Sequence, residues 1–314
     1  WRQRLEQIRD HLTDFYFAYN LPHSLFEKIV RDVLADRAPD SAVSLSFNPE
    51  LAPQSFLLAL AKKYTSLPPE QRDEIKHHLR EITVVLTKSM ISDQMGFIRR
   101  AKAFFDAEDF ETISRRRIGQ GKIGGKAAGM MLAWKILQQD DSADSPNLRD
   151  RVVIPDSYFV GADVFYQFHA INELDEFMNQ KYKPQEEIES EYPAIQEAYV
   201  RGRLPESAGR QLRQLLREVG QTPLIVRSSS LLEDNFGFSF AGKYESFFLP
   251  NQGLPEQNLS ALTNAISLIY ASVLSPDALL YRRQMGLVDY DERMAILIQK
   301  VQGQCYRDLC FPTV

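Results

Sequence analysis

The chain has 314 residues, of which 44% are hydrophobic and 25% are charged, as in an ordinary globular protein. This composition excludes intrinsic disorder, a collagen-like repeat and a small disulfide-stapled scaffold, and the length predicts about two domains. A formal net charge of −5 supplies no overall basic field, so we expect neither nucleic acid nor an anionic membrane as a partner.

Two cysteines, Cys305 and Cys310, are too few for a disulfide framework and fit the reducing conditions of the cytoplasm. No run approaches 18 consecutive apolar residues and the N-terminus has no signal-peptide pattern, so we predict a cytoplasmic protein. Because the chain begins with Trp1 and ends in an apolar stretch at Val314, we expect it to be a piece of a longer polypeptide.

The first part of the chain has apolar residues at helical spacing, as in Leu5, Ile8, Leu12 and Phe15. Strand-like alternation is scarce in this part. We therefore predict an all-α helical region over residues 1–112.

From residue 113 onward glycine becomes frequent, and short apolar runs alternate with helical patterns. We predict helices over 126–137, 162–171, 205–219 and 257–284, and strands over 151–155, 158–160, 223–226, 244–249 and 294–301. Residues 113–314 are therefore predicted to form a mixed domain, and the chain as a whole to have an α+β fold.

The first segment that could carry chemistry is rich in glycine and in cations. Five glycines lie within the eleven residues from Gly119 to Gly129, and five cations lie within the twelve residues from Arg115 to Lys126. Glycines allow backbone N–H groups to converge on an anion, and the helix that follows adds the positive end of its dipole. The segment is our best candidate for a phosphate site, with a glycine-rich turn bearing surface cations as the alternative.

Two known phosphate motifs match this segment incompletely. Gly119-x-Gly121-x-x-Gly124 fits the dinucleotide fingerprint, but charged arginines precede it where a buried strand is required. For a P-loop, Gly119 is one residue too far from the Gly-Lys pair, and Ala127 stands where that motif has Ser or Thr. A Rossmann-type dehydrogenase is therefore a distant alternative.

The second candidate segment is an apolar strand, 223–226, that carries Arg227 at its end and is followed by three serines. A guanidinium held at the end of a strand can bind phosphate oxygens through two parallel hydrogen bonds. The alternative is a structural ion pair between Arg227 and either Glu233 or Asp234.

The third candidate segment runs from Ser239 to Phe248 and places Lys243 directly after Gly242. A loop of small residues with a cation could close over a polyphosphate, although a hairpin turn fits the pattern equally well. The sequence shows no His/Cys/Asp set with metal-ligand spacing, so it predicts no metal site within the chain.

Taken in order, these motifs resemble the N-terminal ATP-grasp region, or PEP/pyruvate-binding domain, of the phosphoenolpyruvate synthase and pyruvate phosphate dikinase family. The resemblance runs from about Gly119 to Val314 and rests on residues 124–131, 153–155, 162–165, 201–205, 226–229, 233–234, 239–242, 281–282 and 298–299. It implies a partial ATP-grasp domain over 113–314, truncated at its C-terminal end and preceded by the helical region.

The resemblance also implies roles for residues of this chain. Lys126 and Arg227 would bind the ATP phosphates and would be the catalytic residues, with Arg227 stabilising the phosphoryl group in transit. The other ATP-binding residues would be Gly124, Gly125, Ser228, Gly242, Lys243 and Ser246 around the phosphates, and Gln299, Lys300 and Val301 beside the adenine.

In this family ATP is converted to AMP, and phosphate passes through a histidine on a separate domain to pyruvate or another acceptor. The resemblance places the histidine domain, the acceptor-binding domain and the Mg²⁺ ligands beyond Val314, so the fragment alone is expected to be inactive. Lys243 and Tyr244 stand where better-known members have two glutamines, and residues 1–110 have no counterpart. These departures motivate an alternative function, a non-catalytic nucleotide sensor whose helical region binds a partner.

Overall fold

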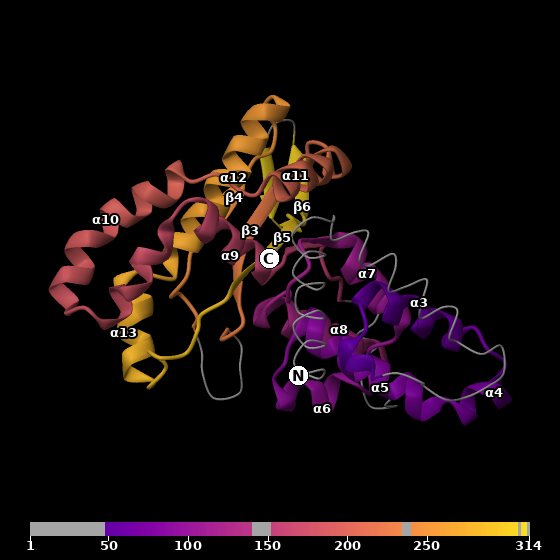
Figure 1. Ribbon diagram of the computed structural model, residues 1–314. Coiled ribbons are helices and arrows are strands. Elements are labelled where there is room, and N and C mark those ends of the chain that lie inside the picture. The colour runs from indigo at the N-terminus through magenta and orange to yellow at the C-terminus, as the bar shows by residue number, and fades with distance from the viewer. Residues whose placement is uncertain (1–47, 140–151, 234–239, 307–308, 313–314) are drawn as a thin grey trace, which may run out of the picture. The chain divides into compact units, whose positions relative to one another are not determined.

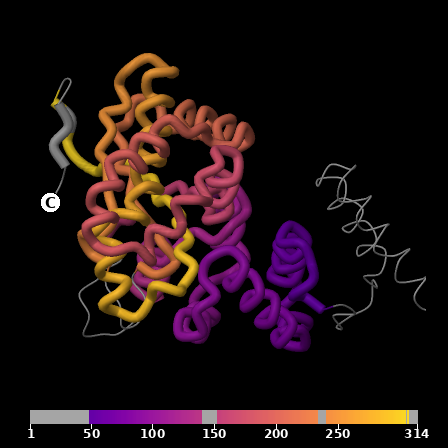
Figure 2. The backbone as a smooth tube through the Cα atoms, turned by 60° about the vertical axis from the view of Figure 1, so that its left-hand side comes forward, coloured from indigo at the N-terminus to yellow at the C-terminus, as the bar shows by residue number. Residues whose placement is uncertain are grey.

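The computed structural model describes residues 48–139, 152–233, 240–306 and 309–312 (Figure 1). The helical pattern predicted before residue 48 lies outside these ranges. The chain divides into two compact units, Trp1–Leu86 and Thr87–Val314. The boundary at residue 112 marks a change in composition and remains a prediction. Figure 2 traces the same path from a second direction, from α3 in indigo to β5 in yellow.

The described part of the first unit is helical. It consists of a 3₁₀ turn, η1 (Pro49–Leu51), and the helices α3 (Gln54–Thr65), α4 (Pro69–Glu74) and α5 (Lys76–Leu86). Pro69 begins α4, because the N–H of the first residue of a helix has no acceptor within the helix and its absence costs nothing there. Helix α3 packs along α5.

The second unit also begins with helices, the π-helical turn η2 (Thr87–Ile91), α6 (Met95–Ala101) and α7 (Ala107–Arg116). Asp106 starts α7 through a capping box, because its carboxylate accepts from the N–H groups of Glu108 and Asp109. Between residues 48 and 116 every regular element that the structure describes is therefore helical.

A five-stranded mixed sheet forms the centre of the second unit. Its strands lie in the order β1-β2-β5-β3-β4, and β1 with β2 is the parallel pair, while the other pairs are antiparallel. Their bounds are Arg117–Ile118, Ser157–Val160, Leu224–Ser230, Ser246–Leu249 and Met294–Lys300 for β1 to β5. The mixture of helices with a mainly antiparallel sheet confirms the α+β class and contradicts a doubly wound dinucleotide fold.

One strand prediction was wrong and a second strand was predicted too short. The described residues of the strand predicted over 151–155 are irregular, and β2 starts at Ser157, because Pro155 has no N–H to donate to a neighbouring strand. The strand predicted to end at Arg227 continues to Ser230, since the three serines pair with β5 as far as Met294. Arg227 is consequently in the middle of β3.

The helices of the second unit cover both faces of the sheet. Alternate residues of β3 and β5, such as Val226 and Ile298, join side chains of α9 to α12 in the main hydrophobic core. The residues between them face α8, where Ser229 and Gln299 make contacts. The bounds are α8 Gly125–Gln139, α9 Ala162–Ile171, η4 Leu174–Tyr182, α10 Gln185–Arg201, α11 Glu206–Val219, α12 Pro255–Ser272 and α13 Pro276–Gln284, followed by the hairpin β6 (Gly303–Tyr306) and β7 (Leu309–Pro312).

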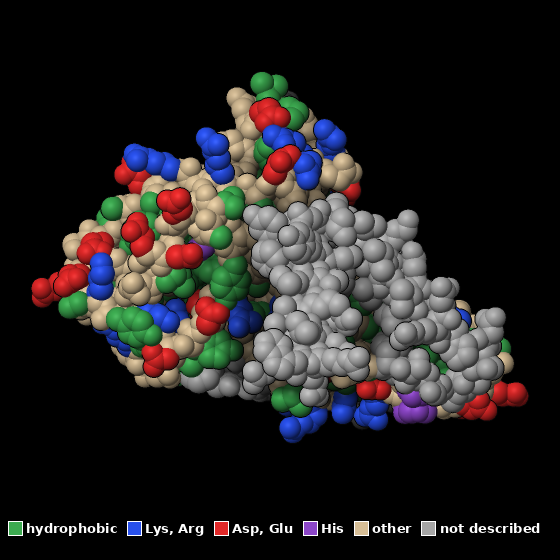
Figure 3. All heavy atoms as spheres, in the orientation of Figure 1, with side chains coloured by type: hydrophobic (Ala, Val, Ile, Leu, Met, Phe, Trp, Pro, Cys, Tyr) green, Lys and Arg blue, Asp and Glu red, His purple; other side chains and the backbone are tan. Residues whose placement is uncertain are grey.

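Among the described residues, one helical stretch, Pro255–Gln284, is long and apolar enough to span a membrane. It comprises α12 and α13, and 61% of its apolar window is buried inside the protein. Ile266, Ile269 and Tyr270 of α12 belong to the main core, so burial in the core accounts for its apolar character. On the face shown in Figure 3, acidic and basic side chains are intermixed over the described surface.

Candidate functional site

The glycine-rich segment is divided into two parts with different environments. In the first part, the N–H groups of Gln120 and Gly121 donate to the carboxylate of Asp163 at 2.9 and 2.7 Å. A Cβ on Gly119 or Gly121 would lie 2.7 Å from the same carboxylate. This part of the loop already holds an anion of the protein itself, so its N–H groups serve the contact with α9.

In the second part, the glycines lie against the end of β3. Gly124 has φ +84°, and a Cβ there would lie 1.5 Å from the carbonyl oxygen of Ser229. A Cβ on Gly125 would lie 1.8 Å from the carbonyl oxygen of Glu233. Only glycine permits this approach, which brings the first turn of α8 against β3.

The hydroxyl of Ser229 ties the start of α8 to the strand. It accepts a hydrogen bond from the N–H of Ala127 at 3.0 Å and donates to the carbonyl of Ile123 at 2.9 Å. Ser229 therefore satisfies one of the N–H groups that a helix leaves without a partner in its first turn. Lys126 is fixed on this turn.

The five cations that are close together in the sequence have different partners in the structure. Lys122 lies 2.5 Å from Asp93, Arg116 lies 3.1 Å from Asp156, and Arg117 donates to the carbonyl of Gly121 at 2.9 Å. Arg115 is exposed. Of the five, Lys126 is the cation that contacts β3, so the phosphate candidate narrows to the segment 124–126.

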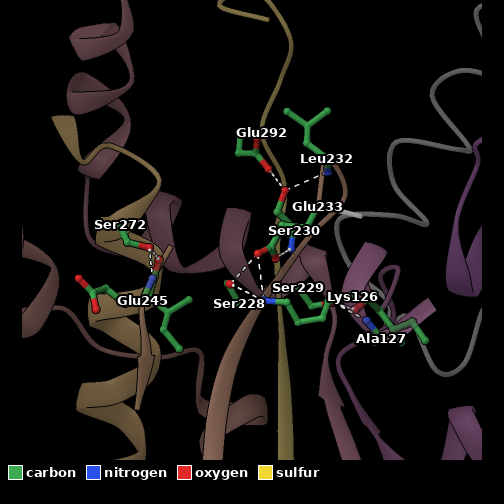
Figure 4. A network of polar contacts seen from close by, with 12 residues as sticks. Lys126, Ala127, Ser228, Ser229, Ser230, Leu232, Glu233, Glu245, Ser272 and Glu292 are labelled. Carbon is green, nitrogen blue, oxygen red and sulfur yellow. Dashed lines mark hydrogen bonds and ion pairs between the residues drawn. The ribbon is translucent and has the colours of Figure 1, made fainter. Parts of the chain in front are cut away.

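Lys126 belongs to a network of polar side chains at the end of β3 (Figure 4). Its ammonium lies 3.1 Å from Oε1 of Glu233 and 3.3 Å from Oγ of Ser228. The Ser228 hydroxyl also donates to Oε1 of Glu233 at 2.9 Å, and the N–H of Ser230 donates to Oε2 at 2.8 Å. Three residues, one from α8 and two from β3, therefore donate to the carboxylate of Glu233.

The network continues to a second buried carboxylate, Glu292, just before β5. The Ser230 hydroxyl donates to Glu292 and accepts from the N–H of Leu232 at 2.9 Å. Glu292 is 1% exposed, and this burial raises its pKa to about 7. Burial also raises the pKa of the neighbouring Tyr244 phenol well above its ordinary value.

Sequence reasoning did not assign Ser229, Ser230 or Glu292 to the site. A signal was available, because three serines that continue an apolar strand are buried hydroxyls and require polar partners. The partners come from residues 123, 127 and 292, which no local pattern connects to the serines.

Arg227 lies between Leu297 of β5 and Ser246 of β4 in the register of the sheet. Directly opposed residues of antiparallel strands point to the same face, so Ser246 lies beside Arg227. Arg227 is half-buried, and its guanidinium has no ion pair within the described parts of the chain. The ion pair considered with Glu233 is wrong, because Glu233 binds Lys126, and Asp234 lies outside the described residues.

The residues expected beside the adenine lie at the end of β5. The Gln299 amide donates to Oγ of Ser157 at 3.0 Å and contacts the sulfur of Met130 at 3.3 Å, one turn beyond Lys126 on α8. Lys300 pairs with Asp156 at 2.9 Å, and the N–H of Val301 donates to the carbonyl of Pro223 at 2.9 Å.

A pocket of about 240 Å³ opens beside this end of β5. Its lining combines apolar and aromatic side chains with paired charges, and it includes Met130, Trp134, Asp156, Ser157 and Phe159. Two of these residues contact Gln299 directly.

The third candidate segment, which contains Gly242 and Lys243, lies against α13 and not against Lys126. Gly242 has φ +72° with open space around it, and the ammonium of Lys243 lies 5.6 Å from the centre of the Tyr281 ring on α13. Phe240 stacks on Tyr244 at 5.4 Å. Lys243 therefore contacts α13, and the structure does not bring it to Lys126. Among the described residues there is no group of three or more His, Cys, Asp or Glu side chains that could hold a metal ion.

Comparison with known proteins places these residues in a family. Rifampicin phosphotransferase from Streptomyces sviceus is 34% identical over 94 residues, which cover 30% of this chain and 10% of that relative. The chain thus spans a small part of the relative's length. Residues 120–306 match the AMP/ATP-binding domain of pyruvate phosphate dikinase, and this match confirms the family expected from the motifs. Because it covers more than half of the residues and includes the whole network around Lys126, this chain belongs to the family of the pyruvate phosphate dikinase AMP/ATP-binding domain.

Proposed function

We propose that this chain is the ATP-binding portion, of the ATP-grasp type, of a dikinase-type phosphotransferase in the cytoplasm. The full-length enzyme would convert ATP to AMP and pass phosphate through a histidine outside these residues to pyruvate or a related acceptor. The observation that carries the proposal is the meeting of α8 and β3, where Lys126 contacts the residue next to Arg227 in a chain of the AMP/ATP-binding family.

In this proposal Lys126 and Arg227 bind the ATP phosphates. Lys126 lies in the first turn of α8, where the helix dipole favours an anion. Arg227 is half-buried on a rigid strand, from which a guanidinium can bind two phosphate oxygens and stabilise charge on the phosphoryl group in transit. The other residues proposed to contact the ATP phosphates are Gly124, Gly125, Ser228 and Ser246.

The adenine would lie at the end of β5, beside Gln299, Lys300 and Val301. The pocket next to Gln299 supports this assignment, because an adenine ring is planar and Trp134 and Phe159 provide aromatic surface. Gly242 and Lys243 are proposed to cover the triphosphate, which requires the Lys243 ammonium to leave the Tyr281 ring.

The proposal includes Mg²⁺, which would neutralise phosphate charge when bound. The described acidic residues do not form a site for it, since both oxygens of Glu233 accept hydrogen bonds and no suitable cluster is present among these residues. We therefore propose that the Mg²⁺ ligands lie outside the described residues.

The decisive experiment is phosphorus NMR of ATP incubated with Mg²⁺ and the full-length protein, once with pyruvate and once with rifampicin. The second acceptor is included because the relative from Streptomyces sviceus is named for it. AMP together with phosphate, pyrophosphate or a phosphorylated acceptor is the expected result. Intact ATP would contradict dikinase chemistry and favour the nucleotide sensor. ADP alone would also contradict it and would indicate a different phosphotransfer reaction.

Arg227→Ala in the full-length protein tests the site. We expect turnover to fall by at least about 100-fold, because the phosphoryl group loses its charge partner. The melting temperature should change little, since Arg227 has no ion pair among the described residues. Arg210→Ala, which removes an exposed cation of α11 paired with Glu206, is the control. Unchanged turnover in Arg227→Ala would reject the assignment.

A further inference from the structure

The carboxylate of Glu233 is held in place by β3 itself. Glu233 is 3% exposed, and its two oxygens accept from the Ser228 hydroxyl at 2.9 Å and from the Ser230 N–H at 2.8 Å. Neither donor belongs to Lys126, so the position of the carboxylate is set by the strand and the turn that follows it.

Lys126 is bound to this fixed group. Its ammonium lies 3.1 Å from Glu233 and 3.3 Å from Ser228, and its side chain is 22% exposed. Figure 4 shows Lys126 reaching from the start of α8 to both residues. An ammonium has three N–H donors, so two are directed at Ser228 and Glu233 and the third is available to a ligand.

We propose that Glu233 is a positioning residue for ATP, because it fixes the Lys126 ammonium so that the phosphates meet an oriented donor. This inference rests on the proposed ATP binding. The Lys126–Glu233 pair is neutral as a whole, so Lys126 supplies direction while Arg227, which has no ion pair in the described ranges, supplies net positive charge. A lysine–glutamate pair has the same effect on a phosphate-binding lysine in protein kinases.

The test is a double-mutant cycle on ATP binding, measured by titration calorimetry in the full-length protein. The four proteins are the wild type, Glu233→Gln, Lys126→Met and the double variant. Glutamine retains an acceptor for β3 but loses the charge that attracts the ammonium, so Glu233→Gln should weaken ATP binding about tenfold. In the Lys126→Met background the same change should not weaken binding, because it only removes a carboxylate near the phosphates.

Three comparisons separate positioning from a merely structural effect. Adenosine has no phosphate and should bind the wild type and Glu233→Gln equally well. Glu187→Gln, which changes an exposed glutamate of α10, should bind ATP as the wild type does. Should Glu233→Gln fail to fold, Glu233→Asp keeps the charge but shortens the side chain that holds Lys126, and it should weaken ATP binding in the same direction.

The outcomes distinguish this inference from the function on which it rests. A wild-type protein that binds no ATP would overturn both. ATP binding that Glu233→Gln weakens equally in both backgrounds would overturn the positioning role alone. Tighter ATP binding by Glu233→Gln in the wild-type background would do so too, since Glu233 would then be a competitor of phosphate for Lys126.

Discussion

Glu292 is the residue whose charge the fold controls most directly. Its carboxylate faces Ser230, Tyr244, Arg282 and Glu233, and burial raises its pKa from an ordinary 4.5 to about 7. Because the folded protein holds this proton more tightly than the unfolded chain, the protonated Glu292 makes its full contribution to the free energy of unfolding below pH 4.5. That contribution is lost as the pH rises to about 7 and does not change further above it.

The expected result of Glu292→Gln follows from the direction of this pH dependence. The wild type should lose up to about 3 kcal/mol of unfolding free energy between pH 5 and pH 8 relative to Glu292→Gln, which has no carboxyl to ionise. Urea unfolding at several pH values measures the difference. His169, whose pKa burial lowers to about 4, has the opposite slope but is common to both proteins. The control is Glu176→Gln, which changes an exposed glutamate and should behave as the wild type. Parallel pH curves for the wild type and Glu292→Gln would mean that Glu292 does not titrate in this range.

At the scale of elements, the contact between α8 and β3 sets the position of Lys126 relative to the strand that carries Arg227. Ser229→Ala leaves the N–H of Ala127 and the carbonyl of Ile123 without their buried partner. We expect a loss of about 2 kcal/mol in unfolding free energy and weaker ATP binding, measured by urea unfolding and calorimetry.

A buried serine of α12 provides the matched control. The hydroxyl of Ser267 has no hydrogen-bond partner among the residues described. Ser267→Ala should therefore keep the wild-type stability within about 0.5 kcal/mol and the wild-type ATP affinity. Equal effects of the two substitutions would show that the hydroxyl of Ser229 does not tie α8 to the strand.

Elements with strong local signals were predictable from the sequence. Helix α9 spans the predicted residues Ala162–Ile171, because Gly161 and Asn172 bound an apolar helical pattern. The extent of β3 was not predictable, since its serines depend on buried acids, and one of them, Glu292, lies 62 positions from Ser230. Lys126 and Arg227 were identifiable by motif, but the contact of Lys126 with Glu233 joins residues 107 positions apart.

At the scale of the molecule, every residue proposed to bind ATP lies in the second unit, Thr87–Val314. A protein that begins at Thr87 should unfold cooperatively and bind ATP with the same dissociation constant as the whole chain. Calorimetry with ATP and a thermal melt of both proteins measure this. A truncated protein that melts cooperatively but has lost ATP binding would mean that residues before Thr87 take part in the nucleotide site.

The strand order has a consequence for the growing chain on the ribosome. Strands β2 and β3 do not pair with each other, and both pair with β5, the last strand of the sheet in sequence order. Until Met294–Lys300 has left the ribosome, β1–β2 and β3–β4 remain two separate ribbons, and two-stranded ribbons are only marginally stable in water. Chain synthesis therefore supplies the strand that joins them late, and a premature stop before residue 294 leaves both ribbons with an open edge, the kind of surface at which chains aggregate.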